Sequence, residues 1–167
     1  RRARLYPAIA PLTNCLAIAR HAPQFCIARL SAKAVFADSL DIFALESFSP
    51  FAVLQARPHE LWARFFGSSI KDDLRYTPSD CFETFPLPSA YEANLKLEAV
   101  GHSYFKFRAA LMVDNDQGMT KTYNRFHDPA EHFPGILRLR ELHSEMDRVV
   151  LAAFGWDDLA ACAEPIF

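Results

Sequence analysis

The chain has 167 residues, of which 51% are hydrophobic and 13% aromatic, with a formal net charge of −2. This size and composition predict one ordinary domain with a real core and exclude a disordered chain. The small negative charge excludes a protein that binds nucleic acid by charge alone. No apolar run is long enough to cross a bilayer and no signal segment is recognisable, so we predict a cytoplasmic protein without a membrane partner.

The two halves of the sequence differ in charge. Residues 1–90 hold ten Lys and Arg against eight Asp and Glu, a balance of +2, whereas residues 91–167 hold eight against twelve, a balance of −4. A basic binding surface is therefore expected in the first half. The chain starts Arg-Arg-Ala-Arg without Met, which we interpret as a cut inside a longer polypeptide.

The first half is predicted to be β-rich with one helix. Short apolar or alternating runs occupy residues 12–20, 24–30, 34–37 and 40–45. Their close spacing leaves no room for crossover helices, so the sheet should be mainly antiparallel.

One helix is predicted over about residues 50–66. Ser49 is its expected cap and Pro50 its first residue, and Gly67 is its expected end. Pro58 falls on the apolar stripe of this helix and should kink or split it. Residues 72–90 are rich in proline and are predicted to be irregular.

The second half is predicted to be an antiparallel helical hairpin. Two apolar stripes step by three and four residues, one over residues 97–111 and the other over residues 139–153. Pro134 suits a helix start, and Gly155 followed by Trp156 suits a C-terminal cap. We therefore predict an α+β fold: residues 1–90 are a small, mainly antiparallel β-region with one helix, and residues 91–167 are the helical hairpin.

The motifs of common catalytic sites are absent from the sequence. There is no glycine-rich phosphate loop, no Gly-x-Ser-x-Gly and no His-Glu-x-x-His. The four cysteines are scattered without a Cys-x-x-Cys pair, which favours reduced thiols over a zinc site: Cys15, Cys26, Cys81 and Cys162. We predict no catalytic residue, no metal site and no cofactor in this chain.

Candidate nucleic-acid contacts lie at turns and strand ends. In the β-region they are Arg20, His21, Arg29, Ser31 and Lys33. Such side chains can hydrogen-bond base edges or phosphates from short loops. The alternative interpretation is that they are ordinary surface residues.

The loop between the predicted helices supplies two more candidates. Lys121 and Arg125 lie in a polar run that suits phosphate contact. The alternative is a structural loop held against the hairpin by Tyr123 and Phe126.

Several stretches of the sequence resemble one family. Residues 51–69 and 74–88, the latter including Tyr-Thr-Pro-Ser-Asp-Cys-Phe-Glu-Thr-Phe-Pro, resemble the end of the target-recognition domain in MmeI-like restriction-modification enzymes. Residues 118–129, 139–148 and 154–157 are similar to later parts of the same group and of large methyltransferases from phage-exclusion systems. The resemblance spans roughly residues 12–158, and one departure is Leu87, where the family usually has Phe.

The resemblance implies a large parent enzyme that uses S-adenosylmethionine to methylate adenine N6 at a specific DNA site. The methyltransferase domain, and in some relatives a nuclease domain, would lie upstream. This chain would supply recognition of double-stranded DNA and contact the upstream methyltransferase domain, and the target adenine would be flipped into a pocket outside it. The alternative function is a protein-interaction module that docks another domain or subunit without contacting DNA.

Overall fold

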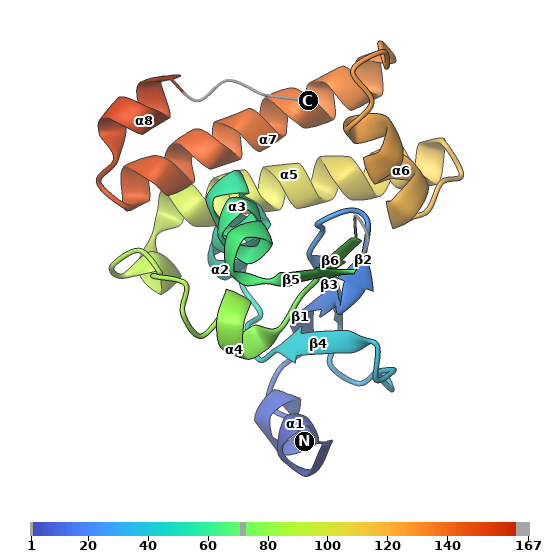
Figure 1. Ribbon diagram of the computed structural model, residues 1–167, viewed down its shortest axis with the longest axis vertical. Helices are drawn as coiled ribbons and strands as arrows, with labels where there is room; N and C mark the ends of the chain where they lie inside the picture. The colour runs from blue at the N-terminus through green and yellow to red at the C-terminus, as the bar shows by residue number, and fades with distance from the viewer. Residues whose placement is uncertain (1, 71–72, 163–167) are drawn as a thin grey trace.

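The structure is a computed structural model that describes residues 2–70 and 73–162. Figure 1 shows two small sheets and a helix pair, with further helices between them, as the predicted α+β fold requires. Among the residues described, no helix is long and apolar enough to span a membrane.

Two three-stranded antiparallel sheets make up the β-region. In the first, β1 (Asn14–Ala19) lies between β3 (Ala28–Ser31) and β4 (Leu40–Phe43). In the second, β6 (Asp73–Arg75) lies between β2 (His21–Ala22) and β5 (Ser68–Ile70). Only Arg20 separates β1 from β2, and its carbonyl accepts a hydrogen bond from the backbone N–H of Tyr76 at 2.9 Å. The antiparallel pairing predicted from the short connections is confirmed.

The β-region differs from the sequence prediction in four places. Residues 34–37 form no strand, and the strand expected over residues 24–30 begins only at Ala28. Helix α1 (Arg2–Ile9) and the hairpin of β5 and β6 were not predicted. The apolar side chains that suggested strands are buried against the core instead of in a paired ladder: Phe25, Ile27 and Phe36. Hydrophobic periodicity indicates which residues are buried, but it does not distinguish a strand from a loop that packs on the core.

The predicted helix is split in two, as Pro58 required. Helix α2 (Phe48–Gln55) ends and α3 (Arg57–Phe66) begins at Ala56, and Pro58 lies in the first turn of α3. The expected cap is wrong, because Ser47 precedes the helix and the Ser49 hydroxyl donates to the Tyr91 carbonyl.

The proline-rich segment after the sheet has some regular structure. Within residues 72–90, predicted to be irregular, the described part contains β6 and the short helix α4 (Pro78–Cys81). The division of the chain after residue 90 stays a prediction.

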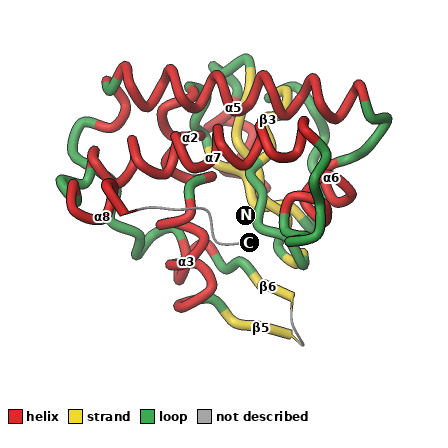
Figure 2. Tube along the Cα trace, turned by 90° about the horizontal axis from the view of Figure 1, so that it is seen from above, coloured by secondary structure: helices red, strands yellow, loops and turns green. Residues whose placement is uncertain are grey.

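The second half is the predicted antiparallel hairpin. After the 3-10 turn η1 (Tyr91–Ala93), helix α5 (Leu95–Asp114) runs beside α7 (Pro134–Ala153), as Figures 1 and 2 show. Helix α6 (Met119–Phe126) joins them at one end, and α8 (Asp157–Cys162) follows at the other.

The start of α5 and the end of α7 are capped by a side-chain motif and a glycine motif, respectively. The Asn94 side chain accepts from the N–H groups of Lys96 and Leu97 at the start of α5. After α7, Gly155 has φ of 76°, and the Trp156 N–H donates to the Leu151 carbonyl, which is the expected glycine cap.

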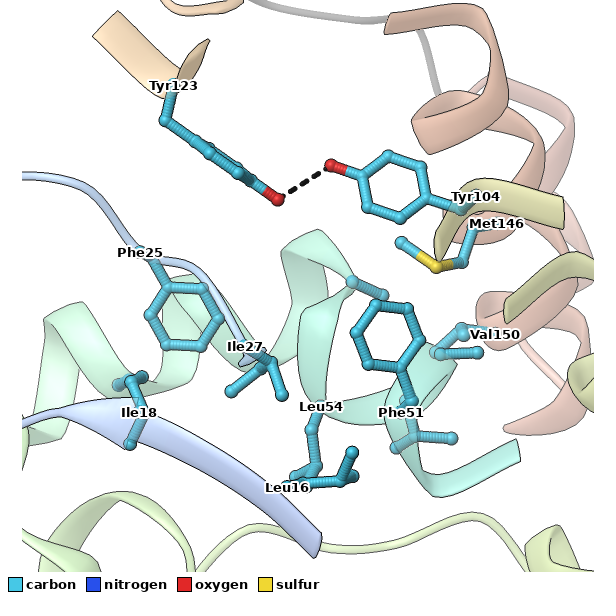
Figure 3. Close-up of a cluster of buried hydrophobic side chains, with 14 of the residues drawn as sticks. Leu16, Ile18, Phe25, Ile27, Phe51, Leu54, Tyr104, Tyr123, Met146 and Val150 are labelled. Carbon is cyan, nitrogen blue, oxygen red and sulfur yellow. Dashed lines mark hydrogen bonds between the residues drawn. The ribbon is translucent and has the colours of Figure 1, made fainter. Parts of the chain in front are cut away.

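Helix α2 lies at the centre of the core. Every residue from Ser49 to Gln55 is buried, which is typical of a helix surrounded by protein. Figure 3 shows its Phe51 and Leu54 between side chains of β1 and side chains of the hairpin, such as Tyr104 and Met146. One core therefore joins the two halves of the chain.

Helices α2 and α5 touch at a glycine, and we expect Gly101→Ala to destabilise the fold. A Cβ atom at Gly101 would lie 2.2 Å from the backbone oxygen of Phe48, so the helices would have to move apart. Such overpacking costs roughly 1–3 kcal/mol of unfolding free energy. Gly118→Ala is the control, because a Cβ there meets nothing within 4 Å, and we expect it to cost less than about 1 kcal/mol as a helix-cap change. Equal losses in urea unfolding of the two variants would contradict this account.

His59 is expected to make stability depend on pH. Its Nδ1 donates to the Leu54 carbonyl at 2.8 Å, and its Nε2 lies 3.2 Å from the Tyr76 hydroxyl. Burial lowers the pKa of His59 to about 4 from its ordinary 6.5. The neutral form is favoured in the folded state, so this contribution is complete above pH 6.5 and is lost as pH falls toward 4.

The loss by pH 4 should reach about 3 kcal/mol of unfolding free energy. We expect His59→Gln to have a flatter dependence than the wild-type chain between pH 7 and pH 4. Parallel curves for the two proteins would show that His59 is not the group responsible.

Candidate nucleic-acid interface

The seven predicted contact residues fall into two groups. Five lie in the β-region and two on α6, where the sequence analysis expected a loop. The seven residues are Arg20, His21, Arg29, Ser31, Lys33, Lys121 and Arg125. The surroundings of each residue determine whether its side chain can contact a ligand.

The three arginines of this set are held by the protein. Arg20 Nε lies 3.0 Å from Oδ1 of the buried Asp41. Arg29 Nε donates to the Glu46 carbonyl at 3.1 Å, and its guanidinium lies over the Phe48 ring at 4.9 Å. Each of these contacts fixes a strand end or a helix start.

Arg125 is held in the same way on α6. Its Nε lies 2.6 Å from Glu131 Oε2, its Nη1 donates to Gln117 Oε1 at 3.2 Å, and its guanidinium lies over the Phe133 ring at 4.9 Å. The arginines thus have structural partners whether or not they also reach a ligand.

Ser31 and Lys33 are exposed at the turn that follows β3. The Ser31 hydroxyl accepts from the Lys33 N–H at 3.3 Å, and its carbonyl accepts from the Ala34 N–H at 3.1 Å. This turn presents one hydroxyl and one ammonium group to solvent. That arrangement suits a phosphate contact.

A row of polar side chains crosses the second sheet. His21 of β2 is opposite Arg75 of β6, and Arg75 is opposite Ser68 of β5. Directly opposed residues project from the same face of a sheet, and all three are exposed. Sequence reasoning missed Arg75 and Ser68, because β5 and β6 were not predicted and pairing alone brings these residues beside His21.

Helix α6 lies next to the loop that leaves β2. Gln24 Nε2 donates to Asn124 Oδ1 at 3.2 Å, across a hundred residues of sequence. Lys121 is exposed on the same helix. Lys121 therefore extends the surface that starts with His21.

The turn after β3 lies away from this surface. Ser31 pairs with Asn14 at the start of β1, whereas His21 follows the end of β1. Seven residues of extended chain separate these points by about 20 Å. The predicted set therefore divides into two exposed patches, Ser31 with Lys33 and His21 with Lys121.

No metal centre is found in the described parts of the chain, where no three His, Cys, Asp or Glu side chains gather as ligands. The four cysteines are free thiols. Burial raises the pKa of the Cys81 thiol, as it does for Cys15 and Cys26.

Comparison with known proteins identifies one region. Residues 20–89 match the family described as MmeI, target recognition domain. A solved structure of the Type IIL restriction-modification enzyme MmeI in complex with DNA matches 86% of this chain with a TM-score of 0.67 and 18% identity. At that identity the match establishes a shared fold, and it covers 19% of the MmeI chain. No curated protein sequence matches.

Arg20→Ala is expected to lower the unfolding free energy, whether or not Arg20 also contacts a ligand. It would leave the carboxylate of Asp41 buried without its cation, and Asp41 Oδ2 already has no hydrogen-bond partner among the described residues. We expect a loss of about 1–3 kcal/mol in unfolding free energy.

The double variant Arg20→Ala/Asp41→Ala tests that cause. It should lose less than the sum of the two single variants, because it removes both charges together. Additive losses in urea unfolding would show that the ion pair is not responsible.

Proposed function

We propose that this chain, which contains an MmeI-like target-recognition region over residues 20–89, recognises a specific sequence in double-stranded DNA. The observation that carries the proposal is the match of that region to a target-recognition family, together with the polar row that its strands present. The finer proposal is that the chain belongs to a large restriction-modification enzyme that methylates adenine N6.

The exposed residues fall into two kinds: those suited to contact phosphates and position the duplex, and those suited to contact base edges. Lysines at turns and on helix surfaces contact phosphates and set the register of a duplex. An arginine on a strand can pair with the O6 and N7 edge of guanine in the major groove, and a histidine or serine can hydrogen-bond a base. Lys33 and Lys121 are therefore suited to phosphate contacts. The side chains suited to base contacts are those of Arg75, His21 and Ser68.

The charge pattern supports a small contact surface. Residues 1–90 carry a balance of +2 within a chain of net charge −2, so binding by charge alone should be weak. Sequence preference would then come from a few groove contacts.

Methyl transfer is assigned to an upstream domain that binds S-adenosylmethionine and receives the flipped adenine. The chain matches only 19% of the length of MmeI, so this assignment is part of the proposal. The residues of this chain would place the duplex against that domain.

DNA binding by this chain should be sensitive to salt and to two lysines. In fluorescence anisotropy with a mixed-sequence duplex, we expect Lys33→Ala or Lys121→Ala to lower the affinity at low salt. Each should also reduce the slope of log affinity against log salt by about one.

Lys96→Ala is the matched control, because Lys96 is exposed at the end of α5 that lies away from α6. A wild-type chain that binds no duplex at low salt would contradict the proposal. So would a loss for Lys96→Ala as large as those for the other two lysines.

One observation favours a second candidate function, the docking of another domain. Helices α3, α7 and α8 line an open apolar groove of about 1120 Å³. Its exposed lining includes Leu61, Phe65, Phe66, Trp156 and Leu159. We assign its occupant to the upstream methyltransferase domain, because the related MmeI chain extends far beyond the part matched here.

Phe65→Ser tests the docking candidate. Phe65 is 81% exposed in this chain, so the substitution should leave its own unfolding midpoint unchanged. In the parent enzyme it should lower the unfolding midpoint if the groove is a domain interface. An unchanged unfolding midpoint of the parent enzyme would rule out the docking function.

A further inference from the structure

The backbone of Ile27 is held by side chains instead of a neighbouring strand. Ile27 is fully buried and precedes β3 by one residue. Its N–H donates to Gln55 Oε1 at 2.8 Å, and its carbonyl accepts from Arg108 Nη2 at 2.9 Å. A buried peptide group needs hydrogen bonds at both its N–H and its carbonyl. Gln55 of α2 and Arg108 of α5 supply these bonds in place of a neighbouring strand. We call these two bonds the Ile27 clamp.

The helical half of the chain orients the guanidinium in this clamp. Arg108 Nη1 donates to Gln55 Oε1 at 3.2 Å and to the Tyr123 hydroxyl at 2.8 Å. The Tyr123 and Tyr104 hydroxyls are joined at 2.8 Å, as Figure 3 shows beside Ile27. The position of the Ile27 carbonyl is therefore set by Arg108 of α5, and Tyr123 of α6 adds one further contact to the guanidinium.

The clamp lies in the middle of a segment that carries three of the seven predicted contacts. His21 precedes it, and Arg29 and Ser31 follow it in β3. Between His21 and the clamp, Gln24 bonds Asn124, and the Phe25 ring packs on His59 with centroids 5.4 Å apart. Residues 23–27 have no strand partner, so side-chain contacts of this kind decide where the segment lies.

We propose that Arg108 is a positioning residue for DNA recognition: through the Ile27 clamp, the helical hairpin sets the placement of residues 21–31 and so the ability to distinguish one DNA sequence from another. The inference rests on the proposed function. Hydrogen bonds to base edges weaken steeply with small errors in distance and angle. Phosphate contacts tolerate such errors better, so sequence discrimination should suffer before overall affinity does.

Two variants of the full chain break the clamp from different helices. Arg108→Lys keeps the positive charge but lacks the planar fork that reaches the Ile27 carbonyl and the Tyr123 hydroxyl together. Gln55→Met keeps the volume and removes the acceptor for the Ile27 N–H. If one of them does not fold, the other carries the test.

The readout is discrimination between two duplexes. The duplex that the wild-type chain selects from a randomised library is compared with a shuffled duplex of the same composition. We expect each variant to lose about ten-fold or more in the ratio of the two affinities, as for a mismatched base pair, while affinity for the shuffled duplex changes less than about two-fold. Amide hydrogen exchange should accelerate at residues 24–29.

Tyr123→Phe and Gln55→Glu are the matched controls. Tyr123→Phe removes one partner of Arg108 and leaves both bonds of the clamp, and Gln55→Glu keeps an acceptor oxygen. Both should retain discrimination even where the unfolding midpoint falls.

The outcomes separate this inference from the proposed function. If exchange accelerates in Arg108→Lys but discrimination is kept, or if Tyr123→Phe loses as much discrimination as Arg108→Lys, the positioning role is overturned. If the wild-type chain selects no sequence from the library, the proposed function fails, and the inference fails with it.

Discussion

The buried guanidinium of Arg108 is the constraint around which the rest of the structure is arranged. Among the described residues it has no carboxylate partner, and its side chain is 2% exposed. Three hydrogen bonds and four aromatic rings 5.3–5.8 Å from the guanidinium carbon offset the cost of removing the charge from water. Burial raises the pKa of Tyr104 and Tyr123, so both stay neutral hydroxyls. These partners come from the β-region, α2, α5 and α6, so the two halves of the chain must assemble together.

Arginine has the same structural use elsewhere in the chain. Arg140 donates to the carbonyls of Phe126, Arg125 and Asp128, and so satisfies the end of α6. Arg20 and Arg125 hold carboxylates, while lysines and short polar residues occupy the exposed turns. The side chains that are free to meet DNA are therefore few. On the proposed function, arginines that place those side chains would contribute to recognition without touching the duplex.

Lys121 and helix α8, which lines the apolar groove, lie at opposite ends of the helical hairpin. Helix α6, which carries Lys121, precedes α7, and α8, which lines the groove, follows it. Twenty helical residues separate them by about 30 Å. On the proposed function, the α6 end of the hairpin would contact DNA while the α8 end packs against a neighbouring domain.

The sequence by itself determined the α+β class, the antiparallel hairpin, the split at Pro58 and the glycine cap at Gly155, because helical periodicity, proline and positive φ act locally. Its motifs also indicated the target-recognition family. Only the tertiary structure decided that residues 34–37 are a loop in which Phe36 alone is buried, that Arg75 and Ser68 lie beside His21, and that Arg108 holds Ile27. These features depend on which distant segments meet in the core, and no local pattern encodes a contact across eighty residues of chain.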